Sequence, residues 1–176
     1  MDYVEKTIRT NYVYQGKILS LRRDDVCLHD GSPAIREIID HDGGACVLFV
    51  EQDKVLFVKQ YRYAYGESVL EIPAGKLKKG EDPSKAAARE LEEEAGIKAE
   101  ELQLLHVMYP TPGYTNEKIY IYQAKSGKKT ATRLDDGEFL QTLWLPLEEV
   151  KKMLESGEIK DGKTINALQA YLLKNK

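Results

Sequence analysis

The chain has 176 residues, 42% of them hydrophobic and 31% charged, and its formal net charge is −3. This length suits one domain with a sizeable core, and the slightly acidic balance argues against a nucleic-acid-binding surface. The sequence contains no apolar run of about 18 residues, so we expect no membrane span, and the N-terminus lacks the apolar core of a signal peptide. Cys27 and Cys46 lack metal-ligand spacing, so we expect reduced thiols in a cytoplasmic protein.

The first 42 residues have the hydrophobic pattern of short strands joined by turns. Gly16 separates two of them in a hairpin-like arrangement, and Asp30-Gly31 marks a further turn. A pair of glycines at 43–44 then precedes a continuous apolar run typical of a buried strand. The strands predicted in this half cover residues 13–14, 17–28, 34–39, 45–50 and 54–61. We therefore predict an N-terminal β-sheet region, residues 1–42, and a main domain, residues 43–176.

The rest of the chain alternates helical and strand-like patterns. Residues 72–80 predict a loop before a helix over 83–95, and residues 125–137 predict a charged loop. The other elements predicted here are strands over 102–109, 117–124 and 139–145, and amphipathic helices over 146–154 and 163–173. This order predicts an α+β fold, in which a mixed sheet carries helices on both faces as an α/β/α sandwich. A small antiparallel β-sheet would stand at the N-terminus.

The helix over 83–95 has clear end signals. Asp82 is a suitable N-cap, and Pro83 suits the first helical position, where its missing N–H costs nothing. Gly96 suits the left-handed stop after the last turn. A narrow apolar stripe at i, i+4 and i+8 consists of Ala87, Leu91 and Ala95.

The same helix concentrates negative charge. Glu90, Glu93 and Glu94 share one face, where like charges repel by roughly 0.2–0.5 kcal/mol per pair. A solvated surface helix is the plain alternative. Carboxylates without His or Cys partners otherwise suit Mg²⁺, or Mn²⁺ in its place, and Mg²⁺ often shares its ligands with substrate phosphates. The residues therefore favour hydrolysis of a diphosphate, in which the cation polarises a phosphoryl oxygen and a further carboxylate accepts a proton.

The order of residues around this helix resembles the signature box of the Nudix hydrolases. The matching positions, at the box spacing, are Gly75, Glu81, Arg89-Glu90-Leu91, Glu93-Glu94 and Gly96-Ile97. The family hydrolyses nucleoside diphosphates linked to another moiety, so the resemblance implies a small-molecule nucleoside diphosphate substrate. Gly75 and Gly96 would shape the loop and the helix end, and Glu81 would be mainly structural.

The resemblance also implies chemical roles. Glu90 and Glu94 would bind the metal, and Ala74 would offer it a backbone carbonyl. Glu93 would be a further ligand or a catalytic helper. Arg89 would form ion pairs with the box carboxylates and orient them.

Segments that flank the box resemble the ADP-ribose pyrophosphatase branch of the family. They are residues 60–62, 71–77, 109–114, 136–139 and 157–161. This resemblance implies Mg²⁺-dependent hydrolysis of ADP-ribose to AMP and ribose 5-phosphate. Two alternatives stay open: another nucleoside diphosphate sugar or a dinucleotide as the substrate, or a nucleotide sensor without turnover.

The branch resemblance implies further substrate contacts. Arg62 would bind the diphosphate or the terminal ribose, since a guanidinium suits phosphate geometry. Glu71 would contact substrate hydroxyls. Ile18, Arg36 and the pair Pro112-Gly113 would complete the substrate site, with Arg36 able to stack on adenine. The bland alternatives are a surface ion pair for Arg62 and an exposed strand position for Glu71.

The proton acceptor has several candidates. Glu138 matches a loop glutamate proposed as the catalytic base in the branch, although it could be an ordinary loop acid. Glu93 and Glu117 are its rivals. Relatives form homodimers through their N-terminal strands, and the small N-terminal sheet here is consistent with a homodimer.

Overall fold

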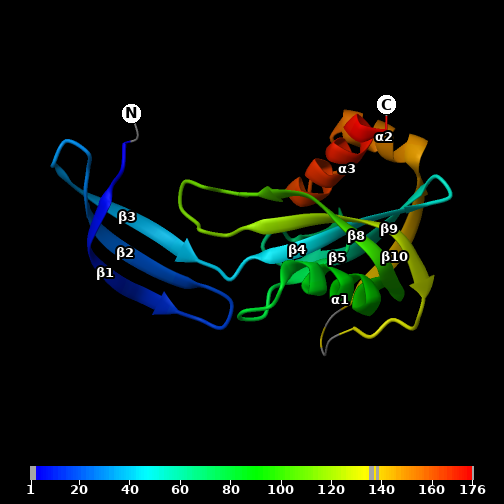
Figure 1. Ribbon diagram of the computed structural model, residues 1–176, viewed down its shortest axis with the longest axis horizontal. Coiled ribbons are helices and arrows are strands. Elements are labelled where there is room, and N and C mark those ends of the chain that lie inside the picture. Colours follow the sequence, from blue (N-terminus) through cyan, green and yellow to red (C-terminus); the bar gives the residue numbers. More distant parts are fainter. Residues whose placement is uncertain (1–2, 135–136, 138, 176) are drawn as a thin grey trace. The chain divides into compact units, whose positions relative to one another are not determined.

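The computed structural model describes residues 3–134, 137 and 139–175 (Figure 1). By their contacts the residues group into two compact units. The N-terminal unit comprises Met1–Gly43 and Tyr109–Lys118, and the main unit comprises Gly44–Met108 and Ile119–Lys176. The loop at 109–118 thus groups with the N-terminal strands, which the predicted boundary at residue 42 does not anticipate. The assignment of residues 1–42 and 43–176 as two functional domains stays a prediction.

The N-terminal unit is a three-stranded antiparallel sheet in the order β1-β2-β3. Its strands are β1 (Lys6–Gln15), β2 (Ser20–Cys27) and β3 (Pro33–Asp40). Gly16 lies in the predicted hairpin turn, where its N–H donates to the Leu19 carbonyl at 2.9 Å. The loop at 109–118 is attached to β3 by the Ile39 N–H, which donates to the Tyr114 carbonyl at 2.7 Å.

The main unit is built on a mixed sheet in the order β10-β5-β4-β9-β8, with β6 paired to β5 and β7 paired to β4. The strands are β4 (Gly44–Glu51), β5 (Lys54–Arg62), β6 (Glu67–Glu71), β7 (Ala74–Lys76), β8 (Ile97–Met108), β9 (Ile119–Lys129) and β10 (Leu140–Pro146). β4 and β9 are parallel, and the other pairs are antiparallel. This confirms the predicted mixed sheet.

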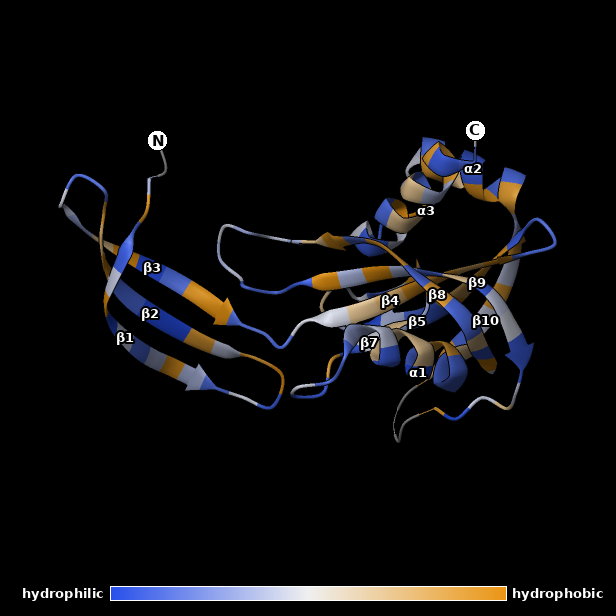
Figure 2. Cartoon of the chain, viewed as in Figure 1, coloured by the Kyte–Doolittle hydropathy of each residue, from blue (hydrophilic) through white to orange (hydrophobic). Residues whose placement is uncertain are grey.

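Helices cover both faces of this sheet, as predicted (Figures 1 and 2). They are α1 (Pro83–Ala95), α2 (Leu147–Ser156) and α3 (Gly162–Lys174). Because side chains alternate along a strand, Val47 of β4 packs in one core with Leu91 of α1, whereas Leu48 packs in a second core with Leu168 of α3. All four side chains are fully buried, and each such burial contributes roughly 1.5–3 kcal/mol.

Two predicted loops are partly strand. Residues 74–76 of the predicted 72–80 loop form β7, and residues 125–129 of the predicted charged loop extend β9. Both corrections have the same cause, because the residues gain their strand conformation from pairing with distant segments. Ala74 pairs with Cys46 of β4, and Lys129 pairs with Ile97 of β8.

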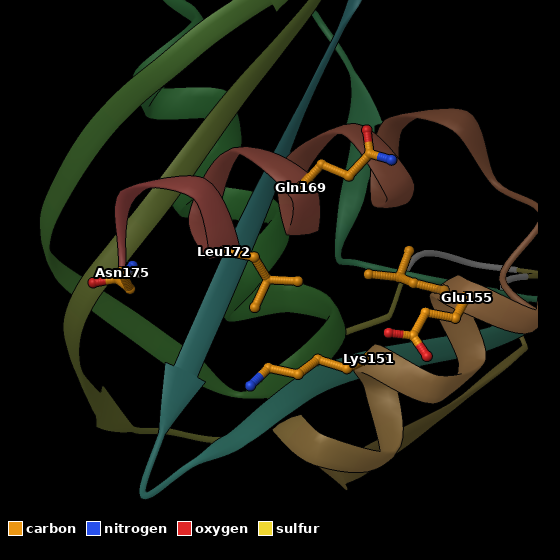
Figure 3. A pocket seen from close by; sticks show the side chains of 6 residues that line it. Lys151, Glu155, Gln169, Leu172 and Asn175 are labelled. Atoms are coloured by element: carbon orange, nitrogen blue, oxygen red, sulfur yellow. The ribbon is translucent and has the colours of Figure 1, made fainter.

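A hollow of about 500 Å³ lies between α2 and α3 (Figure 3). Its lining residues are Lys151, Leu154, Glu155, Gln169, Leu172 and Asn175. None of the predicted site residues is among them. In the described part of the chain, no helix is long and apolar enough to cross a membrane.

Candidate functional site

The acidic helix α1 begins and ends at the residues that the sequence predicts. Asp82 is the N-cap, and its carboxylate accepts the Ser84 N–H at 2.8 Å and the Lys85 N–H at 3.4 Å. Gly96 ends the helix with φ of 63°, and its N–H donates to the Glu92 carbonyl at 3.0 Å. A Cβ at this glycine would lie 2.7 Å from the Thr130 carbonyl oxygen. The end of α1 is therefore set by both backbone conformation and space.

Arg89 joins three of the box carboxylates. Its Nη1 donates to Glu90 at 2.6 Å and to Glu93 at 2.9 Å, while Nε and Nη2 donate to Glu81 at 3.1 and 3.2 Å. Burial opposes the Arg89 charge, but these hydrogen bonds and the Glu90 charge raise the Arg89 pKa well above its ordinary value. A hydrogen bond from Arg89 lowers the pKa of Glu81. One guanidinium thus offsets the like-charge repulsion on this face of the helix.

Glu90 and Glu94 face the backbone of β7. They are 9% and 1% exposed, and the Ala74 N–H donates to Glu94 Oε2 at 3.0 Å. A Cβ at Gly75 would overlap the Glu90 carboxylate, so only glycine lets the backbone approach so closely. The resemblance singled out Ala74 and Gly75, and the structure brings both against the buried carboxylates.

The donor set of this region suits a hard divalent cation. The groups brought together are carboxylates and a backbone segment, and oxygen ligands of this kind are those that Mg²⁺ prefers. Within residues 3–134, 137 and 139–175, no three His, Cys, Asp or Glu side chains stand close enough together to hold a metal ion. The residue types of the site therefore fit such a cation. Glu90 and Glu93 are held by hydrogen bonds from Arg89 and are not arranged as a ready metal-binding group.

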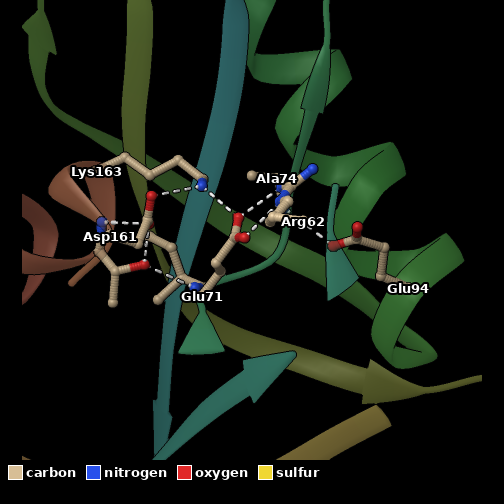
Figure 4. A network of polar contacts seen from close by, with 8 residues as sticks. Arg62, Glu71, Ala74, Glu94, Asp161 and Lys163 are labelled. Atoms are coloured by element: carbon tan, nitrogen blue, oxygen red, sulfur yellow. Dashed lines mark hydrogen bonds and ion pairs between the residues drawn. The ribbon is translucent and has the colours of Figure 1, made fainter. Parts of the chain in front are cut away.

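Arg62 and Glu71 form a second cluster in the main unit (Figure 4). Arg62 Nε and Nη2 each donate to one oxygen of Glu71 at 2.6 Å. Lys163 Nζ donates to Glu71 Oε2 at 2.5 Å and to Asp161 Oδ1 at 3.0 Å. Glu71 is only 2% exposed, whereas 41% of the Arg62 side chain is exposed. The carboxylate is therefore internal, and the guanidinium is the group that a ligand can reach.

The pKa values in this cluster favour the charged forms. Burial opposes ionisation of Glu71, but hydrogen bonds and charges from Arg62 and Lys163 outweigh it and lower the Glu71 pKa. Burial likewise opposes the Lys163 charge, and Asp161 and Glu71 raise the Lys163 pKa above its ordinary value. Hydrogen bonding to Glu71 raises the Arg62 pKa against burial, and the charges of Asp161 and Glu94 add to the shift. The cluster is thus two cations held against two anions.

The N-terminal unit holds five of the predicted residues: Ile18, Arg36, Pro112, Gly113 and Glu117. Arg36 Nε donates to Glu5 at 2.9 Å, and Ile18 is 57% exposed. Pro112 and Gly113 belong to the loop at 109–118, which is attached to β3. Their substrate contacts stay predictions. Glu117 lies 3.4 Å from His41 Nδ1.

Glu138, the predicted catalytic base, lies outside the described residues. The sequence analysis missed Lys163, Asp161 and Thr164, which surround Glu71. The sequence could have indicated Asp161, because it is a suitable N-cap before a predicted helix. It could not have indicated that Lys163 contacts Glu71, 92 positions earlier in the chain.

Comparison with known protein families shows which family this chain belongs to. Residues 40–168 match the pattern of the NUDIX domain, and residues 5–39 match a nucleoside diphosphate sugar hydrolase N-terminal domain. The chain belongs to the Nudix family. The predicted family is therefore confirmed, as a relationship that spans most of the chain.

Individual Nudix relatives share most of their length with this chain. A methanol dehydrogenase activator from Bacillus methanolicus is 41% identical, covering 95% of this chain and 92% of the relative. An ADP-ribose pyrophosphatase from Bacillus subtilis is 39% identical, covering 97% and 94%, and one from Mycobacterium tuberculosis is 34% identical, covering 88% and 76%. The resemblance to the ADP-ribose pyrophosphatase branch is confirmed.

A solved structure confirms the fold. The crystal structure of an ADP compounds hydrolase superposes with a TM-score of 0.83, covering 95% of this chain and 91% of the other, at 20% identity. The Nudix fold, a mixed sheet with helices and a small antiparallel N-terminal sheet, is therefore present here.

Proposed function

We propose that this Nudix hydrolase cleaves the diphosphate bond of ADP-ribose to AMP and ribose 5-phosphate in a Mg²⁺-dependent reaction. The observation that carries the proposal is the 39% identity, over nearly all of both chains, to an ADP-ribose pyrophosphatase. The intact set of box carboxylates on α1 supports turnover over a sensor role. Another nucleoside diphosphate sugar or dinucleotide is the nearest alternative substrate.

The divalent cation would be held by Glu90, Glu94, the Ala74 carbonyl and Glu93. When bound, the cation would polarise the phosphoryl oxygens and acidify a water molecule, and Mn²⁺ could take its place. Arg89 already contacts Glu90 and Glu93, so its proposed role is to orient these carboxylates. Glu94 is 1% exposed, so its carboxylate is shielded from bulk water.

The exposed guanidinium of Arg62 would bind the substrate diphosphate. Glu71 holds that guanidinium by a two-pronged contact, which fixes the plane that a phosphate would meet. Glu138 is the proposed proton acceptor for the attacking water. Ile18, Arg36, Pro112 and Gly113 are the further proposed substrate contacts. Glu71, which the sequence predicts to contact substrate hydroxyls, is 2% exposed, so in this proposal it acts through Arg62.

A second candidate function is activation of a dehydrogenase. Its support is the 41% identity to a relative named as a methanol dehydrogenase activator. Such a role does not exclude hydrolysis by the same chain. An assay of dehydrogenase turnover with and without this protein would test it.

A substrate panel tests the proposed hydrolysis. Purified protein is incubated with Mg²⁺ and ADP-ribose, NAD, ADP-glucose or nucleoside triphosphates, and AMP release is followed. We expect ADP-ribose to be the best substrate and chelation of the metal to stop the reaction. Cleavage of triphosphates alone would overturn the ADP-ribose assignment, and no cleavage of any compound would overturn the enzyme assignment.

We also infer that two copies of the chain associate through their N-terminal strands in the cytoplasm. Exposed apolar side chains on these strands support this homodimer, since large exposed apolar patches mark interaction surfaces. The N-terminal unit carries Ile8, Tyr12, Val13, Tyr14, Ile18 and Ile35, each more than half exposed.

A further inference from the structure

The first turn of α3 is attached to the strand that leads into the proposed active site. Asp161, the N-cap of α3, accepts the Thr164 hydroxyl at 2.6 Å, and the same hydroxyl accepts the Ile72 N–H at 2.9 Å. Lys163 bridges Asp161 and Glu71. Thr164 is fully buried, and the Lys163 side chain is 12% exposed. One helix end therefore holds both the side chain of Glu71 and the backbone that follows it.

This arrangement bears on Arg62 through charge balance. Glu71 receives hydrogen bonds from two cations, so Arg62 does not neutralise the carboxylate alone. Without Lys163, the buried Glu71 carboxylate would be paired with Arg62 alone. The cluster of Arg62, Glu71, Asp161 and Lys163 would then change from a net charge of zero to a negative one. A negative cluster would repel an anionic substrate.

The same helix end also bears on the backbone at the metal-binding region. Ile72 is followed by Pro73 and Ala74, and Ala74 donates to Glu94. The Pro73 carbonyl accepts the Val47 N–H at 2.9 Å, which holds the segment to β4. A buried ion network is weak support for stability by itself, because desolvation offsets much of the attraction. The contacts of this network with Glu71 and Ile72 indicate that it holds active-site residues in position.

We propose that Lys163, Thr164 and Asp161 are positioning residues of the active site, holding Glu71 and Ile72 so that Arg62 presents its guanidinium to the substrate diphosphate. This inference rests on the proposed function for the identity of the anion. It extends the site to α3, whose residues do not belong to the signature box. None of the three residues needs to touch the substrate.

The role of Lys163 is tested with Lys163→Gln, which removes the cation. We expect KM for ADP-ribose, or for whichever panel compound the wild-type protein cleaves, to rise about tenfold with kcat within about twofold. Lys163→Arg should restore most of the affinity. The matched control is Lys160→Gln, since Lys160 pairs with Glu67 on the surface, where the two side chains are 65% and 47% exposed.

The outcomes for Lys163 are distinct. An unchanged KM in Lys163→Gln would overturn its positioning role. So would a loss of kcat that follows the loss of folded protein and leaves KM unchanged, because that pattern belongs to a purely structural residue. An equal rise of KM in Lys160→Gln would also overturn it, by showing a general effect of surface charge.

The backbone half of the inference is tested without substrate. Thr164→Val removes the hydroxyl that accepts the Ile72 N–H, and Thr164→Ser retains it. We expect the amide hydrogens of Ile72 and Ala74 to exchange about tenfold faster in the valine variant only, with the Leu91 amide unchanged. Unchanged exchange at Ile72 would overturn this half. Because the measurement needs no turnover, failure of the proposed function leaves its result intact.

Discussion

Arg89 shows how a single residue makes an acidic helix face possible. Its guanidinium reaches Glu81, Glu90 and Glu93, and its Nη2 also donates to the Lys76 carbonyl at 3.3 Å. Planar geometry with five donors lets arginine do this, whereas lysine offers only a compact ammonium group. The carboxylates are therefore held in place before any cation binds.

Glu94 is the box residue whose replacement should separate catalysis from folding. Glu94→Gln keeps the shape of the side chain and an oxygen acceptor for the Ala74 N–H, but it removes the negative charge. We expect kcat to fall by about 10²–10³-fold with the protein still folded, as when one group that stabilises developing charge is lost. Steady-state kinetics and circular dichroism measure the two effects.

The matched control is Glu92→Gln, the same chemical change on the same helix outside the predicted metal-binding set. It should leave kcat within about twofold. Near-normal turnover in Glu94→Gln would contradict the metal-binding role.

Glu71 should make stability depend on acid pH. Its folded pKa lies below the ordinary glutamate value, so its contribution to stability is fully present above about pH 4.3. The contribution is lost as the pH falls through the lowered folded value. Glu71→Gln cannot titrate, so its free energy of unfolding should fall less steeply below about pH 4.3 than that of the wild-type protein. Denaturant unfolding at a series of pH values measures this slope, and identical slopes would contradict the prediction.

At the scale of an element, α1 is determined by its ends. The helix starts at the Asp82 cap and stops at Gly96, where a positive φ and the nearby Thr130 carbonyl both require glycine. These ends set which turn faces β4 and β7. A shift of one residue would rotate the carboxylates by about 100° away from Ala74.

Gly96→Ala should therefore destabilise more than a similar change elsewhere. Gly157 ends α2 with φ of 74° and has nothing within 4 Å of an added Cβ, so Gly157→Ala measures the conformational cost alone, about 1–2 kcal/mol. We expect Gly96→Ala to lower the free energy of unfolding by a further 1 kcal/mol or more, about the cost of forcing a close contact. Urea unfolding compares the two variants, and equal losses would show that the segment at residues 130–132 yields to the methyl group.

At the scale of the whole molecule, the N-terminal unit has little apolar surface of its own to bury. Val26 is its one hydrophobic residue among the buried side chains of the described residues, whereas β1 is exposed almost throughout. A three-stranded sheet of this kind gains stability when it packs against further surface. The proposed homodimer would supply that surface.

Ile8→Lys tests the proposed association, because it places a charge on the exposed strand β1. The wild-type protein should have twice the 20.0 kDa chain mass in light scattering, and the variant should shift towards the single-chain mass. Leu173→Lys is the matched control, since Leu173 of α3 is 66% exposed and Ile8 is 67% exposed. A wild-type monomer, or a shift caused equally by both variants, would contradict association through the N-terminal strands.

Much of this protein follows from local sequence pattern. The ends of α1 follow from residues within one turn, the buried strand β4 from its apolar run, and the family from the spacing of Gly75, Glu81 and the glutamates. These features are readable because each depends on residues close together in the chain. The predicted mixed sheet with helices on both faces follows from the order of such elements.

The tertiary structure alone decided the contacts between distant segments. The strand β7 exists because Ala74 pairs with Cys46, and no pattern within three residues could reveal it. Glu71 is buried rather than exposed, and it is paired with Lys163, 92 positions later in the chain. The sequence by itself determined the acidic helix and the hydrolase family. Only the fold brought the first turn of α3 against Glu71, because burial and ion pairing depend on which segments meet.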